Sequence, residues 1–197
     1  MINITSHSSI KITGSKTIWF DPFEISTPTN DADIIFITHS HYDHYSPDDI
    51  KKVRNESTII VAPRDKSIES DYEVSPGDVF DISGIKIEVI PAYNIAKLFH
   101  PKSKKWVGYL VTMDNRTYYV CGDTDATTEA LNVKCDVLLV PCGGKYTMNT
   151  SEAAVLANTI MPETAIPTHY GSVVGKHDDG EEFKRQLNPE IKCNILI

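Results

Sequence analysis

The sequence predicts a layered α/β sandwich, on three observations. The first third of the chain is rich in short runs of β-branched and aromatic residues bordered by turn residues, which are typical of strands. Helical segments are interspersed among the later strands. The chain has 197 residues, and no linker or low-complexity segment divides it. We therefore expect a single domain over residues 1–197, with its strands packed centrally.

Local signals predict the individual elements. Turn residues at Gly14-Ser15 and Asp114-Asn115 each separate two strands. Ser46 before Pro47 predicts a helix start, and Thr150 or Ser151 is the expected cap of a second helix. The expected strands cover residues 2–5, 9–13, 17–20, 34–38, 58–62, 85–91, 106–113, 116–121, 136–141, 164–168 and 191–197. The expected helices cover residues 47–54, 151–160 and 178–187.

The charge balance argues against some classes of partner. A net charge of −8 disfavours binding to a nucleic-acid backbone, which needs clustered Lys and Arg. The basic stretch 102–106 is interpreted as a solvated loop, with contact to a phosphate or acidic substrate as the alternative. No apolar run approaches the ~20 residues that span a bilayer, and the first residues do not resemble a signal peptide. We expect a cytoplasmic protein that binds neither nucleic acid nor membrane.

The most informative stretch runs from Thr38 to His44. It places four metal-capable side chains within six residues, and these are His39, His41, Asp43 and His44. The apolar run 34–37 before it predicts a buried strand, so a rigid scaffold would hold these side chains on a loop. Imidazole and carboxylate donors suit zinc and its neighbours. A polar surface loop explains the pattern poorly, because the stretch holds three of only seven histidines.

Two further donors are expected where later strands end. Asp123 follows the strand 116–121 at the tip of a glycine turn, and His169 follows the strand 164–168. Each oxygen of the Asp123 carboxylate can bind one ion, so this residue can bridge two metals. His169 would complete the shell of the second ion. Taken alone, Asp123 is equally well interpreted as a turn residue and His169 as a core histidine.

The order of these residues resembles the metallo-β-lactamase-fold hydrolase superfamily. Asp21 comes first, followed by the Thr-His-x-His-x-Asp-His motif, Asp123 and His169. Further segments are similar to the compact branch of that superfamily, which includes ascorbate-lactonase-like proteins. These segments are residues 17–23, 91–94, 122–125, 141–148 and 167–171. The resemblance spans nearly the whole chain and implies a four-layer αββα sandwich.

The resemblance also implies roles for single residues. The implied ligands of two metal ions are His39, His41, Asp43, His44, Asp123 and His169. His39 and His41 would bind the first ion, and Asp43, His44 and His169 would bind the second. Asp123 would bridge the two ions. Asp21 would pin the far nitrogen of a ligand imidazole, or is simply a turn residue before Pro22. His7 resembles a histidine in an amino-terminal motif of the compact branch, and either lines the cleft or is a hydrogen-bonded turn residue.

One position departs from the superfamily pattern. A third histidine of the first site usually follows the strand that ends here near Pro91, and this chain has Asn94 instead. Asparagine offers only a neutral carbonyl oxygen, a poorer zinc donor than imidazole. Three arrangements stay open: Asn94 binds weakly, His100 reaches in from the following loop, or the first site is weak or empty.

The motif and the resemblance together predict a metal-dependent hydrolase. A metal-bound hydroxide would attack a small ester, lactone, amide or phosphodiester. Asp43 is the candidate catalytic residue that orients this nucleophile and takes the proton of the water from which it forms. Tyr146, Tyr170 or His7 would donate to the oxyanion or leaving group. Up to two Zn²⁺ ions are expected, with Mn²⁺ or Ni²⁺ as substitutes. The alternative is a metal-binding or sensing protein with a degenerate first site. A small-molecule substrate is the expected partner, and a homo-oligomer stays open.

Overall fold

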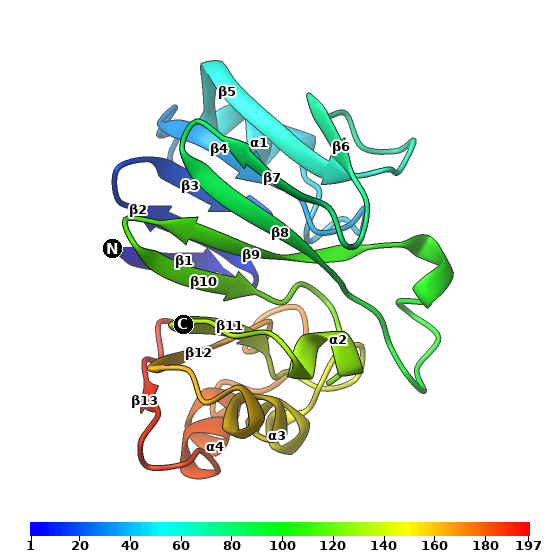
Figure 1. Cartoon of the computed structure of the whole chain (residues 1–197), viewed down its shortest axis with the longest axis vertical. Coiled ribbons are helices and arrows are strands. Elements are labelled where there is room, and N and C mark those ends of the chain that lie inside the picture. The colour runs from blue at the N-terminus through cyan, green and yellow to red at the C-terminus, as the bar shows by residue number, and fades with distance from the viewer.

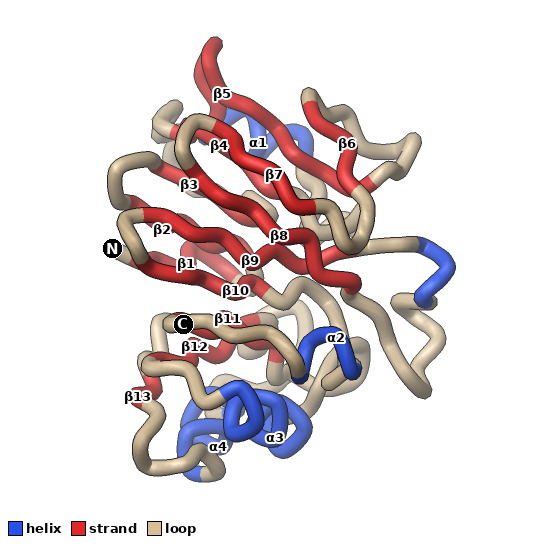
Figure 2. The backbone as a smooth tube through the Cα atoms, viewed as in Figure 1, coloured by secondary structure: helices blue, strands red, loops and turns tan.

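Two β-sheets lie face to face at the centre of the molecule (Figures 1 and 2). The computed structural model describes residues 1–197 without a gap. The first sheet has the order β1-β2-β3-β4-β5-β6, and the second has the order β13-β12-β11-β10-β9-β8-β7. The strands of the first sheet are β1 (Ile2–Ser6), β2 (Ser9–Thr13), β3 (Thr17–Phe20), β4 (Ala32–Phe36), β5 (Arg54–Pro63) and β6 (Tyr72–Val74). Those of the second are β7 (Val79–Ile82), β8 (Ile85–Pro91), β9 (Val107–Met113), β10 (Arg116–Val120), β11 (Val137–Pro141), β12 (Thr164–Thr168) and β13 (Lys192–Cys193).

Helices cover the outer face of each sheet, as Figure 1 shows. The helices are α1 (Pro47–Val53), α2 (Thr128–Leu131), α3 (Thr150–Ile160) and α4 (Asp179–Arg185), with a short 3₁₀ turn η1 (Lys102–Lys104). Ile50 of α1 packs in one buried cluster with Ile35 of the first sheet. Leu156 of α3 and Phe183 of α4 pack in another with Leu138 of the second. The order α-β-β-α confirms the predicted four-layer sandwich.

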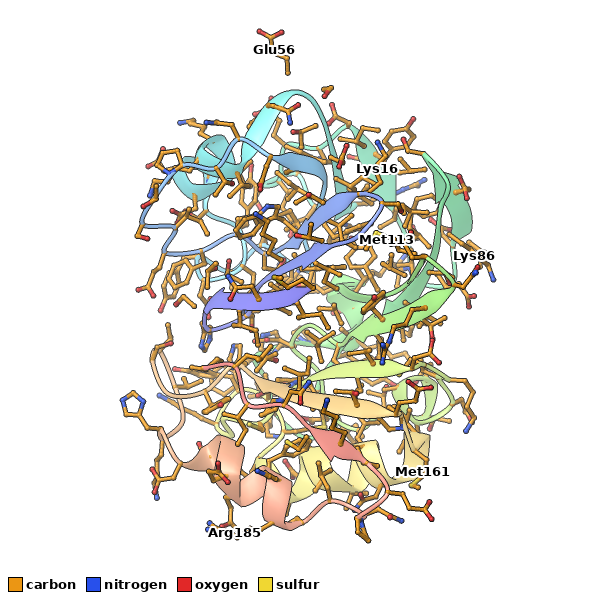
Figure 3. All side chains as sticks on the ribbon, turned by 90° about the vertical axis from the view of Figure 1, so that its left-hand side faces the viewer. Lys16, Glu56, Lys86, Met113, Met161 and Arg185 are labelled. Atoms are coloured by element: carbon orange, nitrogen blue, oxygen red, sulfur yellow. The ribbon has the colours of Figure 1, made fainter.

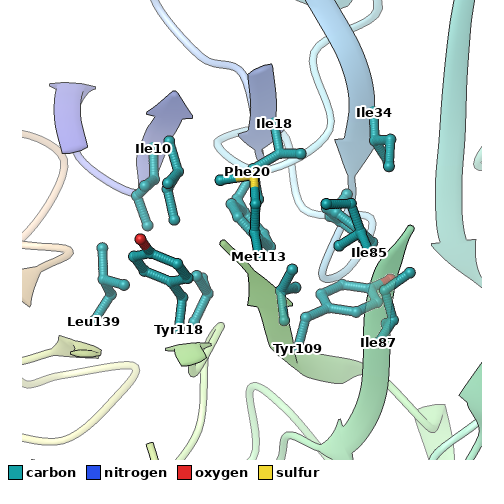
Figure 4. Close-up of a cluster of buried hydrophobic side chains, with 14 of the residues drawn as sticks. Ile10, Ile18, Phe20, Ile34, Ile85, Ile87, Tyr109, Met113, Tyr118 and Leu139 are labelled. Carbon is teal, nitrogen blue, oxygen red and sulfur yellow. The ribbon is translucent and has the colours of Figure 1, made fainter. Parts of the chain in front are cut away.

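The main core lies between the two sheets. It joins 22 buried residues, which include Ile18 and Phe20 from the first sheet and Tyr109 and Tyr118 from the second (Figure 4). Burying apolar surface from both sheets supplies most of the driving force for this arrangement. The one polar atom of Tyr109 is satisfied, because its hydroxyl donates to the carbonyl of Ile37 at 2.8 Å. Charged side chains such as those of Lys86 and Arg185 point outward (Figure 3).

Several element boundaries differ from the sequence predictions. Strand β5 begins at Arg54, four residues before the expected start, because α1 ends at Val53 and the chain pairs at once with β4. The cap of α3 is Asn149 rather than Thr150 or Ser151, and it forms a capping box with Glu152. The last strand is limited to Lys192–Cys193. Strands β6 and β7 and helix α2 were not predicted, since three or four residues carry too little periodicity.

The topology brings the loops of interest to one edge. Strands β3 and β4 run parallel in the first sheet, and β10, β11 and β12 run parallel in the second. Parallel strands release their carboxyl-terminal loops on the same side, which is the usual place for a site in such sheets. The loops after β4, β10 and β12 carry the predicted metal ligands. None of the helices has the length and apolar composition that crossing a bilayer requires.

Candidate metal centre

Asp21 organises the loop that carries the histidine motif. Its Oδ1 accepts a hydrogen bond from the backbone N–H of Thr38 at 2.7 Å, and its Oδ2 accepts one from the Thr38 hydroxyl at 2.6 Å. Nδ1 of His44 donates to the same Oδ2 at 2.6 Å. With Nδ1 held in this way, Nε2 of His44 faces the centre of the cluster. Asp21 therefore has the orienting position that the resemblance implies, between the end of β3 and the loop after β4.

Three imidazoles form the first group of donors. Nδ1 of His41 lies 3.0 Å from Nε2 of His39 and 3.2 Å from Nε2 of His100. The far nitrogen of His39 is engaged, because its Nδ1 lies 3.0 Å from the Thr38 hydroxyl. All three ligand atoms lie within 4.8 Å of one another, which is close enough to share one ion. His100 thus supplies the third imidazole from the loop after β8.

The side chain of Asn94 fixes the position of His100. Its Oδ1 accepts a hydrogen bond from the backbone N–H of His100 at 3.0 Å and lies 3.1 Å from Nδ1 of that ring. Its amide nitrogen donates to Asp125 at 3.2 Å and to the carbonyl of Tyr146 at 3.0 Å. Every polar atom of the Asn94 side chain is therefore in use. The arrangement in which Asn94 itself binds metal does not fit this geometry, and the arrangement with His100 does.

A second group of donors lies beside the first. Asp43, His44 and His169 come together here, and His7 joins them. Oδ2 of Asp43 lies 3.8 Å from Nε2 of both His44 and His169, and 3.4 Å from Nε2 of His7. The His7 ring packs on that of His169 with 3.9 Å between centroids. His7 is a turn residue whose Nδ1 lies 3.3 Å from the Ser172 hydroxyl, and its buried Nε2 side also belongs to the cluster.

Asp123 lies between the two groups. Its Oδ2 is 3.2 Å from Nε2 of His100 and 3.1 Å from Nε2 of His169, and its Oδ1 is 3.3 Å from Nε2 of His44. The carboxylate is buried and faces imidazoles from both groups. This is the placement that a bridging ligand requires.

Several buried donor atoms make no hydrogen bond within the protein. No hydrogen bond engages Nε2 of His7, His44 or His169, nor Oδ1 of Asp123. Buried polar atoms are normally satisfied, and an orphaned set that converges needs an explanation. Imidazole nitrogens and carboxylate oxygens that converge within a few ångströms are the donors of zinc-type centres. The residues present therefore fit one or two divalent cations.

The electrostatics of the cluster favour a bound cation. Burial lowers the pKa of His39 well below its usual value, and it also lowers that of His41, so both rings are neutral. Burial opposes charge on His44 as well, but Asp123 and Asp21 outweigh it and raise the pKa of His44. Burial would raise the pKa of Asp123, but His169 and His44 lower it well below the usual range. A cation can bind neutral imidazoles directly and displace the extra proton of His44.

The backbone at the site is strained in three places. His7, Asp21 and His169 have φ values of 49°, 45° and 57°, in the left-handed region that residues other than glycine rarely adopt. The backbone N–H of His169 donates to the carbonyl of His7 at 3.1 Å, which fixes two of these turns against each other. Strain of this kind is tolerated where it aims a functional side chain.

Trp106 is a site residue that sequence interpretation missed. Its buried ring packs against His39 and His41, with centroid distances of 4.9 and 4.8 Å. Its indole N–H donates to Oδ2 of Asp65 at 3.3 Å, and the same oxygen accepts from the Ser40 hydroxyl at 2.8 Å. Trp106 thus packs directly against the first group of donors. Its only sequence signal was an aromatic residue at the end of the basic stretch.

The two candidate tyrosines lie in different places. Tyr146 lines a cleft of about 370 Å³ above the cluster, together with His41, Tyr42, Asp43, Phe99, His100, Asp123 and Val173. Tyr170 does not: it is buried in the core between the second sheet and the helices. A Cβ added at Gly180 of α4 would lie 2.4 Å from its hydroxyl. The expectation that Tyr170 donates to a substrate is wrong, because its ring packs against α4.

Residues 1–169 match the family model described as the β-lactamase superfamily domain. The chain belongs to this superfamily. A UPF0173 metal-dependent hydrolase from Thermococcus kodakarensis is 30% identical over an alignment of 214 positions. The alignment covers 99% of this chain and 95% of the relative. A candidate metal-dependent hydrolase from Parabacteroides distasonis, 32% identical, superposes with a TM-score of 0.87 over 98% of this chain and 91% of that chain.

A more distant member of the β-lactamase superfamily shares the fold. This candidate zinc-dependent hydrolase from Thermotoga maritima is 20% identical, with a TM-score of 0.69 over 98% of this chain and 96% of that one. The predicted superfamily is thereby confirmed. The chain is a member of a metal-dependent hydrolase family, with a His/Asp cluster of the kind that binds metal.

Proposed function

We propose that this protein hydrolyses a small ester, lactone, amide or phosphodiester with up to two zinc ions. The observation that carries the proposal is the convergence of imidazole and carboxylate donors in two adjacent groups on either side of Asp123, with unsatisfied buried atoms on His44, His169 and Asp123. Four of the donors, which are His41, Asp43, His100 and Asp123, line a cleft open to a small molecule. A structural cation site would be closed, whereas a cleft above the donors leaves room for water and substrate.

The proposed ligands divide between the two groups. His39, His41 and His100 would hold the first ion, and Asp43, His44 and His169 would hold the second, with Asp123 between them. When bound, such ions supply an acidified water molecule and polarise the oxygen of the scissile group. The imidazole-rich donor set favours zinc, with manganese or nickel as substitutes.

The chain's own residues would orient the reaction. Burial would raise the pKa of Asp43, but His7 and His44 lower it, so Asp43 is an anion that accepts rather than donates a proton. It lines the cleft, where it can orient an attacking water and take its proton. Tyr146 lines the same cleft, and His7 lies 3.4 Å from Asp43. Tyr146 and His7 are our candidates for proton donation to the leaving group.

The structure weakens the main argument for a sensing protein. That alternative depended on Asn94 in place of a ligand histidine. Because His100 comes within 3.2 Å of both His41 and Asp123, the first group has three imidazoles although Asn94 is not one of its donors. We therefore favour catalysis.

Metal content and turnover of matched variants test the proposal. Elemental mass spectrometry of zinc-equilibrated protein should find close to two ions per chain. Asp123→Asn should lose at least one ion and reduce hydrolysis of p-nitrophenyl acetate and bis(p-nitrophenyl) phosphate by more than about 100-fold. Asp48→Asn, which changes an exposed carboxylate on α1, should leave both unchanged. Normal metal content and normal turnover in Asp123→Asn would contradict the bridging role, and a metal-free wild type would refute the catalytic function.

A further inference from the structure

We propose that the cleft selects substrates in which the group next to the scissile bond is uncharged and apolar, such as a phenyl ring or a short alkyl chain. The inference rests on the proposed function and specifies the substrate class of the same site. Its support comes from the walls of the cleft, from the positions of the nearby cations, and from an exposed apolar rim.

The walls of the cleft are apolar and aromatic above a polar floor. His41, Asp43, His100 and Asp123 form the floor, whereas Tyr42, Phe99, Tyr146 and Val173 form the walls. Phe99 and Tyr146 pack edge to face with 4.6 Å between ring centroids, although they come from the loops after β8 and β11. A ligand arm that packs against such a pair of rings is recognised by area and shape rather than by charge.

No lysine or arginine lines the cleft. Lys97 and Lys145, the lysines nearest in sequence to Phe99 and Tyr146, both have partners. Nζ of Lys97 lies 2.7 Å from Asp125 and 3.7 Å from Glu152, and Nζ of Lys145 lies over the Tyr146 ring, 4.7 Å from its centroid. A carboxylate or phosphate on the substrate arm would therefore find no protein cation in the cleft. The net charge of −8 further disfavours the approach of an anion.

The rim of the cleft exposes apolar side chains on an anchored loop. Phe99 and Tyr42, which line the cleft, are 47% and 67% exposed, and Ile95 and Leu98 on the Phe99 loop are 67% and 92% exposed. The loop is fixed at its base, because the N–H of Ile95 donates to Asp125 at 2.8 Å and His100 is held by Asn94. Exposed apolar side chains gathered at the mouth of a site mark a binding surface. A bound apolar arm would cover them.

Binding of metal-chelating hydroxamates to zinc-loaded protein tests this inference without turnover. Aceto-, butano- and hexanohydroxamate share the chelating head and differ in the apolar arm, and succinic monohydroxamate carries a charged arm. By isothermal titration calorimetry, affinity should rise about fourfold per buried methylene. The charged arm should bind at least about tenfold more weakly than butanohydroxamate, which has the same number of carbons.

Two variants test whether the cleft walls cause the difference in hydroxamate affinity. Phe99→Ala should weaken hexanohydroxamate about tenfold and leave acetohydroxamate unchanged, because only the longer arm reaches the aromatic wall. Val155→Ala, which removes an exposed apolar side chain on the outer helix α3, should change neither. Since Phe99 is half exposed, its truncation leaves the core intact.

The outcomes separate this inference from the proposed function. Equal affinity across the series, or tighter binding of the charged arm, would overturn the apolar selection even if esters are hydrolysed. Graded binding with no hydrolysis of any ester would overturn catalysis and retain the selection. No hydroxamate binding at all would overturn both. If sedimentation shows a dimer whose formation suppresses hexanohydroxamate binding, the rim serves a second copy of the chain, and the inference is wrong.

Discussion

Asn94 places no donor atom in the candidate metal cluster, and yet the position of His100 in the first group of donors depends on it. Its carboxamide accepts from the backbone and approaches the ring of His100 on one side, and donates to Asp125 and Tyr146 on the other. A ligand imidazole needs its second nitrogen fixed, and removing such a partner usually weakens metal binding 10- to 100-fold. Here an amide oxygen does this for a histidine six residues later.

Asn94→Ala should therefore weaken the binding of one zinc ion by about 10- to 100-fold and leave the other unchanged. Titration against a competing chelator measures the two affinities separately. Asn132→Ala is the control, because Asn132 is exposed and bonds only within the turn of α2. Two ions bound by Asn94→Ala with wild-type affinity would show that His100 needs no such support.

The sequence predicts those site residues that lie in one motif or directly at a strand end. His39, His41, Asp43 and His44 share a loop, and Asp123 follows a recognisable strand and turn. His100 was left as one of three arrangements, because its position depends on how a loop without periodicity folds back. Trp106 and Asp125 act through contacts with distant segments, which local patterns do not encode. The prediction that the Tyr170 hydroxyl faces the substrate was wrong for the same reason.

At the level of elements, Asp49 links helix α1 to the loop between β3 and β4. The Asp49 carboxylate accepts from the backbone N–H groups of Glu24 and Ile25 at 3.0 and 3.1 Å, and from Nζ of Lys52 at 2.8 Å. Burial alone would raise the pKa of Asp49, but Lys52, Ser46 and the backbone amides lower it below the usual value. A lowered folded-state pKa stabilises the protein above the unfolded-state pKa, and this stability disappears as the pH falls through the folded-state pKa.

Asp49→Asn should reduce the free energy of unfolding by about 2 kcal/mol at pH 7, because it removes charge-assisted hydrogen bonds. The difference from wild type should shrink as the pH falls below about 4. Urea unfolding at several pH values checks both statements. Asp48→Asn, the neighbouring exposed carboxylate, is the matched control and should change stability little. A difference that is independent of pH would assign the effect to packing.

Elements differ in how far their sequence determines them. Helix α3 has 11 residues and a periodic apolar face, and its range was predicted to within one residue. Strand β7 has only four residues and exists because it pairs with β8 from Val79↔Glu88 to Ile82↔Ile85. Pairing of this kind is a tertiary interaction, so a short strand carries little signal of its own.

At the scale of the whole molecule, the metal cluster joins the two sheets. His39, His41, Asp43 and His44 follow β4 in the first sheet, and Asp123 and His169 follow β10 and β12 in the second. His100 follows β8, also in the second sheet. A cation bound by residues from both halves stabilises the folded chain, because the unfolded chain does not assemble these donors.

Zinc should therefore raise the melting temperature. At a free concentration of 100 times Kd, one bound ion adds about 2.7 kcal/mol to the free energy of unfolding. Differential scanning calorimetry with and without zinc measures the shift, and EDTA should reverse it. Magnesium is the control, since it prefers oxygen donors and should have little effect. An unchanged melting temperature at saturating zinc would mean that the cations do not join the sheets.

The left-handed backbone at His7, Asp21 and His169 has a consequence for how such genes change over time. Each of these positions holds the chain in a conformation that costs about 1–3 kcal/mol for a residue with a side chain, and glycine would relieve the strain. Genetic drift without selection for the chemistry would therefore favour glycine at all three. We therefore expect histidine, aspartate and histidine at these positions in family members that keep the cluster, and glycine there in members that have lost it.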